Sequence, residues 1–150
     1  MDFKKLTEKA QEAVMTAQNL ASEMTHAEIT PEHLLVALVE QENGIVPSIL
    51  RKMTLDPKDV AGQARMLFES MPKAYGADVR LSPRINLIVQ SAQAEATRMQ
   101  DEYTSTEHLF LALADEKGRS PAAQLTPEER THYEALAKLN EGSANKHSAA

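Results

Sequence analysis

The first half of this chain recurs, without a gap, 75 positions later in the sequence. Eleven of the 33 positions from Leu6 to Leu38 hold the same residue as the position 75 further on, from the Leu6–Leu81 pair to the Leu38–Leu113 pair. At ordinary residue frequencies, chance supplies about two or three such matches. This internal duplication predicts that both halves fold as the same unit, and it makes a site shared by the halves the first candidate for function.

The composition favours one soluble, helical domain. The 150 residues suit a single domain with a substantial core, and only 4% of them are aromatic. A core of Leu, Ile, Val, Met and Ala favours helices over sheets. The chain has no cysteine, which excludes disulfides and thiol chemistry, and its net charge of −6 argues against a nucleic-acid partner. Neither a signal-peptide pattern nor a membrane-spanning run is present, so we expect a cytoplasmic protein with no membrane partner.

Apolar residues at helical spacing predict a long helix at the start of each half. In the first half the stripe consists of Ala10, Ala13, Val14, Ala17, Ala21 and Met24, and every position 75 further on is apolar too. Capping residues followed by proline mark further helix starts, as at Thr30-Pro31 and Ser82-Pro83. The sequence therefore predicts helices near 7–24, 30–42, 47–53, 57–70, 82–100, 105–115, 120–124 and 127–140.

These helices define an all-α fold, an eight-helix pseudo-twofold bundle made of two tandem four-helix repeats. We place the domain at 1–142, with repeat one at about 6–70 and repeat two at about 81–140, and a flexible tail or linker at 143–150. The second helix of each half is apolar nearly all round (LLVALV and LFLALA), so we expect these two helices at the centre, where the halves meet. We expect no strand, and a sheet at the junction of the repeats would contradict this architecture.

Three segments together resemble the Clp N-terminal repeat domain. They are LTEKAQEAVMTAQ, ITPEHLLVALVEQENGIVPSIL, and the run from LSPRINLIV through DEYTSTEHLFLALADEKGRSPAAQL. The resemblance covers roughly residues 1–125, and the MPKAYG and DEYTSTEHL segments are most similar to ClpB-type AAA+ disaggregases. It implies an all-helical domain at the front of a ring-forming AAA+ chaperone that engages unfolded or aggregated polypeptides. Unlike the family, repeat two has only two residues between Ala123 and Thr126, which shortens the seventh helix and makes the halves unequal there.

The sequence carries no motif for catalysis. It has no Gly-Lys pair and therefore no P-loop, no G-x-S-x-G elbow and no H-E-x-x-H helix, so we expect a non-catalytic binding domain without a cofactor. The pairs Glu32-His33 and Glu107-His108 resemble metal ligands, but each lies in the first turn of a predicted helix, where glutamate complements the helix dipole. We favour a half-buried histidine beside such a glutamate, and we expect no metal.

The candidate substrate-binding residues are polar positions, most of them near helix starts. The resemblance implies that positions matching Thr7, Asp101 and Glu107 engage substrate in the ClpB branch. Glu32 is the counterpart of Glu107, and Lys9 and Arg84 together with Glu32 and Glu107 resemble the phosphoarginine-type sites of the ClpC branch. The alternative is structural, because Thr7 at a helix start is a typical cap and the two glutamates suit the dipole.

We expect the substrate-recognition domain of an ATP-dependent ClpB-type disaggregase. Its partners would be unfolded or aggregated polypeptides and the AAA+ ring of the same chain or hexamer, with an apolar client segment docked in a shallow groove between the repeats. Two alternatives stay open. One is an adaptor-docking or phosphoarginine-recognising domain of a ClpC- or ClpA-type protease ATPase, and the other is a stand-alone Clp accessory protein.

Overall fold

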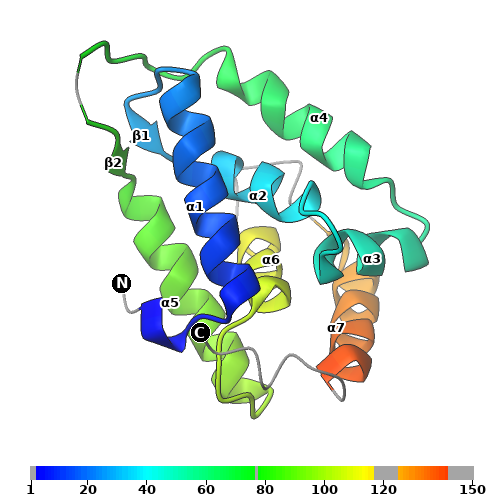
Figure 1. Ribbon diagram of the computed structural model, residues 1–150. Helices are drawn as coiled ribbons and strands as arrows, with labels where there is room; N and C mark the ends of the chain where they lie inside the picture. Colours follow the sequence, from blue (N-terminus) through cyan, green and yellow to red (C-terminus); the bar gives the residue numbers. More distant parts are fainter. Residues whose placement is uncertain (1–2, 77, 117–124, 142–150) are drawn as a thin grey trace.

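The computed structural model describes residues 3–76, 78–116 and 125–141 of the chain. This part contains a short 3-10 helix, η1 (Phe3–Lys5), and the helices α1 (Glu8–Glu23), α2 (Pro31–Val39), α3 (Ile45–Lys52), α4 (Pro57–Phe68), α5 (Pro83–Arg98), α6 (Thr106–Ala114) and α7 (Pro127–Glu141). Figure 1 shows α1 and α5 on one side of α2 and α6, and α3, α4 and α7 on the other. The helical fold class is therefore confirmed. The predicted helix at 120–124 and the tail at 143–150 lie outside the described residues.

Helices α1 and α5 form because each has an apolar stripe and a capped start. The buried residues are Ala10, Ala13, Val14, Ala17 and Ala21 in α1, and Ile85, Ile88, Val89, Ala92 and Ala96 in α5. Thr7 caps α1, since its Oγ1 accepts the Ala10 N–H at 3.2 Å, and Ser82 caps α5 by accepting the Arg84 N–H at 3.1 Å. The predicted stripes and caps are confirmed.

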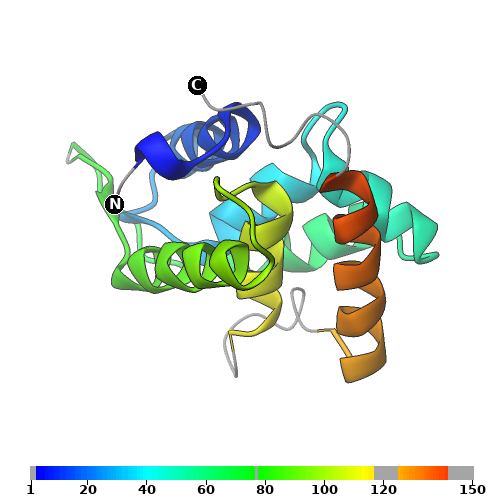
Figure 2. The ribbon, with the colours of Figure 1, turned by 90° about the horizontal axis from the view of Figure 1, so that it is seen from below.

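Helices α2 and α6 lie at the centre of the core. Every residue of both helices is buried, and the two helices contact one another. Viewed from below, α6 lies between α5 and α7 (Figure 2). A helix that is apolar nearly all round is stable only when every face is covered. This is why the sequence could predict that these two helices lie at the centre. Among the described residues, no helix is long and apolar enough to cross a membrane.

The expectation of a fold without strands was wrong at the junction of the repeats. Strands β1 (Glu28–Ile29) and β2 (Arg80–Leu81) form a two-stranded parallel sheet, with Glu28 opposite Arg80 and Ile29 opposite Leu81. Each strand is followed by one residue and then by the proline that starts a helix. The residue before a proline is restricted to an extended backbone conformation. Backbone groups there have no helical partner, so they pair with each other. The contradiction is confined to these four residues.

A second contact repeats this pairing with the halves exchanged. Leu6 forms a parallel bridge with Thr104. Leu6 lies 75 positions before Leu81, and Thr104 lies 75 positions after Ile29. The Thr7 N–H donates to the Thr104 carbonyl at 3.0 Å, just as the Ser82 N–H donates to the Ile29 carbonyl at 3.0 Å. The start of each repeat therefore pairs with the segment before the second helix of the other repeat.

The ends of α1 and α5 reverse the chain in the same way. Each helix is followed by a residue with left-handed backbone, Thr25 (φ 54°) and Gln100 (φ 62°). The N–H groups of the next residues, His26 and Asp101, donate to helix carbonyls at 3.0 and 2.8 Å, which closes the reversal. This geometry positions the side chains of His26 and Asp101 against the second helix of their own repeat.

Helices α4 and α7 pack differently. Helix α4 packs along α2 and α3 of its own repeat, whereas α7 contacts both α6 and α3, a helix of the other repeat. The sequence predicted unequal halves at this corner. Helix α7 consequently joins the two repeats, a role that α4 does not share.

Candidate functional site

The five candidate residues from the sequence gather in two places. Glu32 and Arg84 lie where the N-terminal ends of α2 and α5 meet, which we call the first corner. Thr7, Asp101 and Glu107 lie where the N-terminal ends of α1 and α6 meet, which we call the second corner. The reciprocal backbone contacts described above bring these helix starts together. The two corners are therefore counterparts in the duplicated sequence.

In the first corner, Arg84 is clamped between two carboxylates. Its guanidinium contacts Glu32 at 3.1 Å (Nη1–Oε1) and 2.9 Å (Nη2–Oε2), and Glu116 at 2.9 Å (Nε–Oε2) and 2.8 Å (Nη2–Oε1). The Glu32 side chain is 4% exposed and that of Arg84 is 26% exposed. Hydrogen bonds from Glu116 and Glu32 raise the pKa of Arg84, so the cation persists despite partial burial. The clamp ties α2, α5 and the end of α6 together, and it occupies Glu32 with an internal guanidinium.

In the second corner, the counterpart of Arg84 contacts a different carboxylate. Lys9, the counterpart of Arg84, contacts Glu12 at 3.7 Å on the surface of α1. Glu107, the counterpart of Glu32, is completely buried. Near it lies Tyr133 of α7, whose pKa is raised well above its usual value by burial and by the charge of Glu107. The α7 helix therefore covers Glu107.

His33 and His108 each complete a helix cap, a role that sequence reasoning missed. The Nδ1 atom of His33 accepts the Thr30 N–H at 2.9 Å, and Nδ1 of His108 accepts the Ser105 N–H at 2.9 Å. Glutamate or glutamine usually fills this third position of a capping box. The signal was present as Ser or Thr followed three residues later by histidine, in both halves. Both rings are fully buried, not half-buried as expected.

The far nitrogen of each capping histidine has a different partner. Because Nδ1 is an acceptor in both rings, the proton of the neutral ring resides on Nε2. The Nε2–H of His33 donates to Nδ1 of His26 at 2.7 Å, whereas that of His108 donates to Asp101 Oδ2 at 2.8 Å. Burial and the neighbouring His26 lower the pKa of His33 to about 4. Burial also lowers the pKa of His26, with Lys73 acting in the same direction and the Phe68 carbonyl opposing it.

The Glu-His pairs do not form metal sites within the described ranges. No group of three or more His, Cys, Asp or Glu side chains there is arranged to hold a metal ion. Glu32 faces Arg84 while His33 faces His26, so neighbouring side chains diverge. This arrangement fits the interpretation of helix-start residues.

Cavities occur at the repeat junction and within repeat one. A mostly apolar cavity of about 240 Å³, which we call the junction cavity, is lined by His26, Ala27, Glu28, Thr30, Met71, Pro72 and Arg80. A larger and more polar cavity of about 910 Å³ lies between the end of α2, α3 and α4. The junction cavity is thus small, and the larger of these two cavities lies within repeat one.

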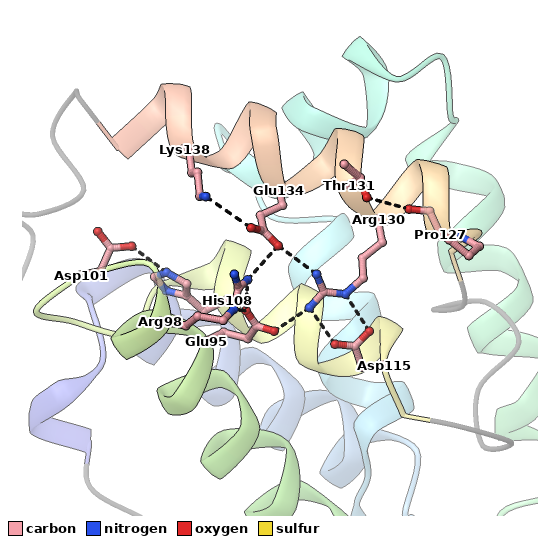
Figure 3. A network of polar contacts seen from close by, with 10 residues as sticks. All are labelled: Glu95, Arg98, Asp101, His108, Asp115, Pro127, Arg130, Thr131, Glu134 and Lys138. Carbon is pink, nitrogen blue, oxygen red and sulfur yellow. Dashed lines mark hydrogen bonds and ion pairs between the residues drawn. The ribbon is translucent and has the colours of Figure 1, made fainter.

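A network of ion pairs connects one side of α7 to α5 and to the end of α6 (Figure 3). Arg130 contacts Asp115 through two bonds of 2.8 Å, and it also contacts Glu95 and Glu134 at 2.5 and 2.9 Å. Arg98 of α5 reaches Glu134 at 2.7 Å. Hydrogen bonds from Arg98 and Arg130 lower the pKa of Glu134 to about 2, against the effect of burial. This network was not predicted from the sequence, because its members belong to α5, to α7 and to the residue after α6.

Comparison with known proteins gives the same family from the sequence. The model of the Clp repeat (R) N-terminal domain matches residues 5–128. Chaperone protein ClpB of Bacillus cereus is 35% identical over 123 residues, which cover 79% of this chain and 14% of the relative. ClpB of Nitratidesulfovibrio vulgaris is 38% identical over 121 residues, covering 77% and 14%. The chain thus spans about one seventh of the length of these relatives.

Solved structures show the same fold at lower identity. The Hsp104 N-terminal domain from Candida albicans matches with a TM-score of 0.76 and 16% identity, over 97% of this chain and 99% of that one. A ClpV N-domain in complex with a VipB peptide matches with a TM-score of 0.64 and 20% identity, over 97% and 85%. With the match over residues 5–128, the chain belongs to the family of Clp repeat N-terminal domains.

Proposed function

We propose that this domain recognises unfolded or aggregated polypeptide segments for a ClpB-type ATP-dependent disaggregase. Segments bound here pass to AAA+ rings of the same chain or hexamer, in the cytoplasm. The domain itself is a pseudo-twofold unit of two repeats that performs no catalysis. The observation that carries the proposal is the identity of 35–38% with ClpB chaperones over more than three quarters of the chain.

The related ClpV domain supports peptide binding as the output of this fold. That N-domain was solved in complex with a VipB peptide. Its fold covers nearly the whole of the present chain, so a surface for an extended segment is compatible with this architecture. We transfer only the class of ligand, a peptide segment, and we place its binding site from the geometry of this chain.

The junction cavity is the place we assign to an apolar client side chain. Its lining comes from repeat one and from the linker that leads to repeat two, with Met71 and Pro72 supplying apolar surface. Leu81, on the neighbouring strand, is 39% exposed and extends this surface. A volume of about 240 Å³ accepts one or two side chains, below the roughly 300–1,000 Å³ of small-molecule sites.

The size of the cavity predicts weak binding by a single domain. Burying about 200 Å² of one aromatic side chain contributes about 5 kcal/mol at 25 cal/mol per Å². Association itself costs about 4–15 kcal/mol, so little net affinity remains. Weak binding suits release of the client to the rings, and several domains around a ring restore the grip through avidity.

The five polar candidates frame the two corners, and we propose that they assist client engagement. Arg84 has the most exposed side chain of the clamp and can reach a client from the first corner. Thr7, Asp101 and Glu107 have caps, hydrogen bonds or complete burial in the second corner. Their contribution to binding therefore requires the corner to open, whereas their structural roles operate in the closed state.

The test is a titration of the domain with a permanently unfolded, apolar client and with the native form of the same protein. The unfolded form should bind and the native form should not. Replacing Met71→Ser should weaken binding several-fold, because it removes apolar surface from the junction cavity. Met66→Ser is the matched control, since Met66 is 74% exposed on α4 and lies outside that cavity. Equal binding of both client forms, or equal effects of the two substitutions, would refute the proposal.

The adaptor-docking alternative makes a different prediction. A folded regulator would be retained in stoichiometric amount in a pull-down, without unfolded chains. Phosphoarginine recognition predicts saturable binding of free phosphoarginine that is lost in a variant combining Glu32→Ala with Glu107→Ala. Because Arg84 already occupies Glu32, this ligand would have to displace an internal guanidinium.

A further inference from the structure

Helix α7 is attached to the domain by little apolar contact. Within residues 127–139, the buried side chains are Tyr133 and Ala137, and Leu136 is partly buried. The fourth helix of repeat one, α4, buries Pro57, Ala61, Ala64 and Phe68 along α2. Buried apolar area is the main source of attachment for a helix, so α7 is the more weakly held of the two.

Charges supply much of the remaining attachment. Arg130 joins α7 to Asp115 at the end of α6 and to Glu95 of α5, and Arg98 joins α5 to Glu134 of α7 (Figure 3). Several of these side chains remain in contact with water, since Arg98 is 50% and Asp115 is 47% exposed. Ion pairs of this kind are screened by salt, unlike the packing of α4.

The surface beneath α7 includes a candidate residue for client engagement. The Tyr133 ring stacks on Phe110 at 4.8 Å, and Phe110 lies one helical turn after Glu107 on α6, so α7 packs over this part of the second corner. The buried Tyr133 hydroxyl has no hydrogen-bond partner within the described part of the chain. A buried hydroxyl without a partner destabilises the docked state relative to one in water. The contact is therefore incomplete where it covers the corner.

We propose that α7 is a releasable cover of the second corner, held by the ion pairs of Arg130 and Arg98 and able to undock while the remaining helices stay folded. Undocking exposes Phe110 and Glu107 of α6. The link to clients rests on the function proposed above, because the uncovered surface would add an aromatic ring and a carboxylate to the sites that a client can reach.

Cysteine labelling measures the undocking directly, because the chain has no native cysteine. Ala137→Cys places a thiol on the buried face of α7, where a thiol reagent reaches it only after undocking. Ala64→Cys places one on the buried face of α4 and reports unfolding of repeat one. Leu139→Cys, at a position 77% exposed, reports the unhindered rate. When opening is fast, the labelling rate follows the population of the open state.

Two perturbations should accelerate labelling at position 137. Raising the salt concentration, or replacing Arg130→Gln, should increase the rate roughly tenfold, while the rates at positions 64 and 139 stay unchanged. Arg65→Gln, which breaks an exposed ion pair between α4 and Glu40, is the matched control and should not affect position 137. Hydrogen exchange of the α7 amides in the cysteine-free protein should show the same salt dependence. Parallel acceleration at positions 137 and 64, or none at position 137 with salt-independent exchange, overturns the proposal.

Client titration separates this cover from the proposed function. Faster labelling at position 137 in Arg130→Gln, together with tighter binding of the unfolded client, supports the cover and its link to clients. Faster labelling without any client binding, in either protein, supports the cover and refutes the proposed function. Faster labelling with unchanged, measurable client binding refutes the link between the two.

Discussion

Acidification should destabilise repeat one through the pair of histidines at its centre. In the neutral pair, Nδ1 of His33 accepts the Thr30 N–H at 2.9 Å and Nδ1 of His26 accepts the His33 Nε2–H at 2.7 Å. The lone pairs of both Nδ1 atoms are therefore occupied by hydrogen bonds. A proton can bind to either ring only by breaking the cap of α2 or the bond between the rings. Phe68 stacks on His33 at 4.8 Å, which leaves no room for water to solvate the charge.

The size and direction of the effect follow from the pKa of His33. Burial lowers it from 6.5 to about 4, so the unfolded chain binds a proton that the folded chain resists. The free energy of unfolding therefore has its full value above pH 6.5 and decreases as the pH falls toward 4. At 1.36 kcal/mol per unit, the loss is about 3 kcal/mol, a large part of the stability of a domain. Glu134, with a pKa of about 2, loses its contribution only below pH 4.5, at the acidic edge of this window.

Urea unfolding followed by far-UV circular dichroism, at pH values between 7 and 4, measures the loss as a change in the free energy of unfolding. His33→Gln keeps a side chain that can complete the capping box but removes the titrating group. This variant should lose most of the pH dependence in the window. His108→Gln makes the same replacement in repeat two and should keep the part that His33 supplies. A wild-type stability that is constant between pH 6.5 and 4, or an undiminished fall in His33→Gln, would refute the reasoning.

Three further substitutions test the packing and the ion pairs. Arg84→Ala should lower the free energy of unfolding by about 3 kcal/mol, because it leaves the buried Glu32 carboxylate without its cation, whereas Arg65→Ala, at an exposed pair, should change it by less than about 1 kcal/mol in the same urea assay. Leu38→Ala in the fully buried α2 should cost about 2–5 kcal/mol, measured by calorimetry, and a smaller loss would contradict the central place of this helix. Tyr133→Phe should leave stability unchanged or raise it by up to about 1 kcal/mol, because the buried hydroxyl it removes has no hydrogen-bond partner among the described residues, and a clear loss of stability would contradict this reasoning.

The helices and the core were predictable because they depend on local patterns. The stripe from Ala10 to Ala21 recurs 75 positions later, and each copy became a buried face. The caps at Thr7 and Ser82 also depend on neighbours within three residues. Periodicity and capping are properties of a short segment, so a single sequence reveals them.

The contacts between distant segments were not predictable in the same way. The β1–β2 pairing joins residues about 50 positions apart. Strands of two residues are too short to show the alternation of apolar and polar residues that predicts a strand. The clamp of Arg84 depends on Glu116, at the far end of a different helix. The packing of Tyr133, which comes from the last helix, on Phe110 of α6 was missed for the same reason. The sequence suggested an association of Glu32 with Arg84 through a resemblance to a known type of site, and the structure places these two side chains in contact.

The reciprocal contacts between Leu6 and Thr104 and between Ile29 and Leu81 bear on how such a chain can arise. A lone copy of the unit would expose both partners of this exchange, with nothing of its own to satisfy them. Two identical copies, however, would satisfy each other through a twofold-symmetric interface in which each side supplies what the other lacks. Gene fusion of such a homodimer would join the copies through the segment that is now residues 71–80, after which each half could diverge, as His26 and Asp101 have done.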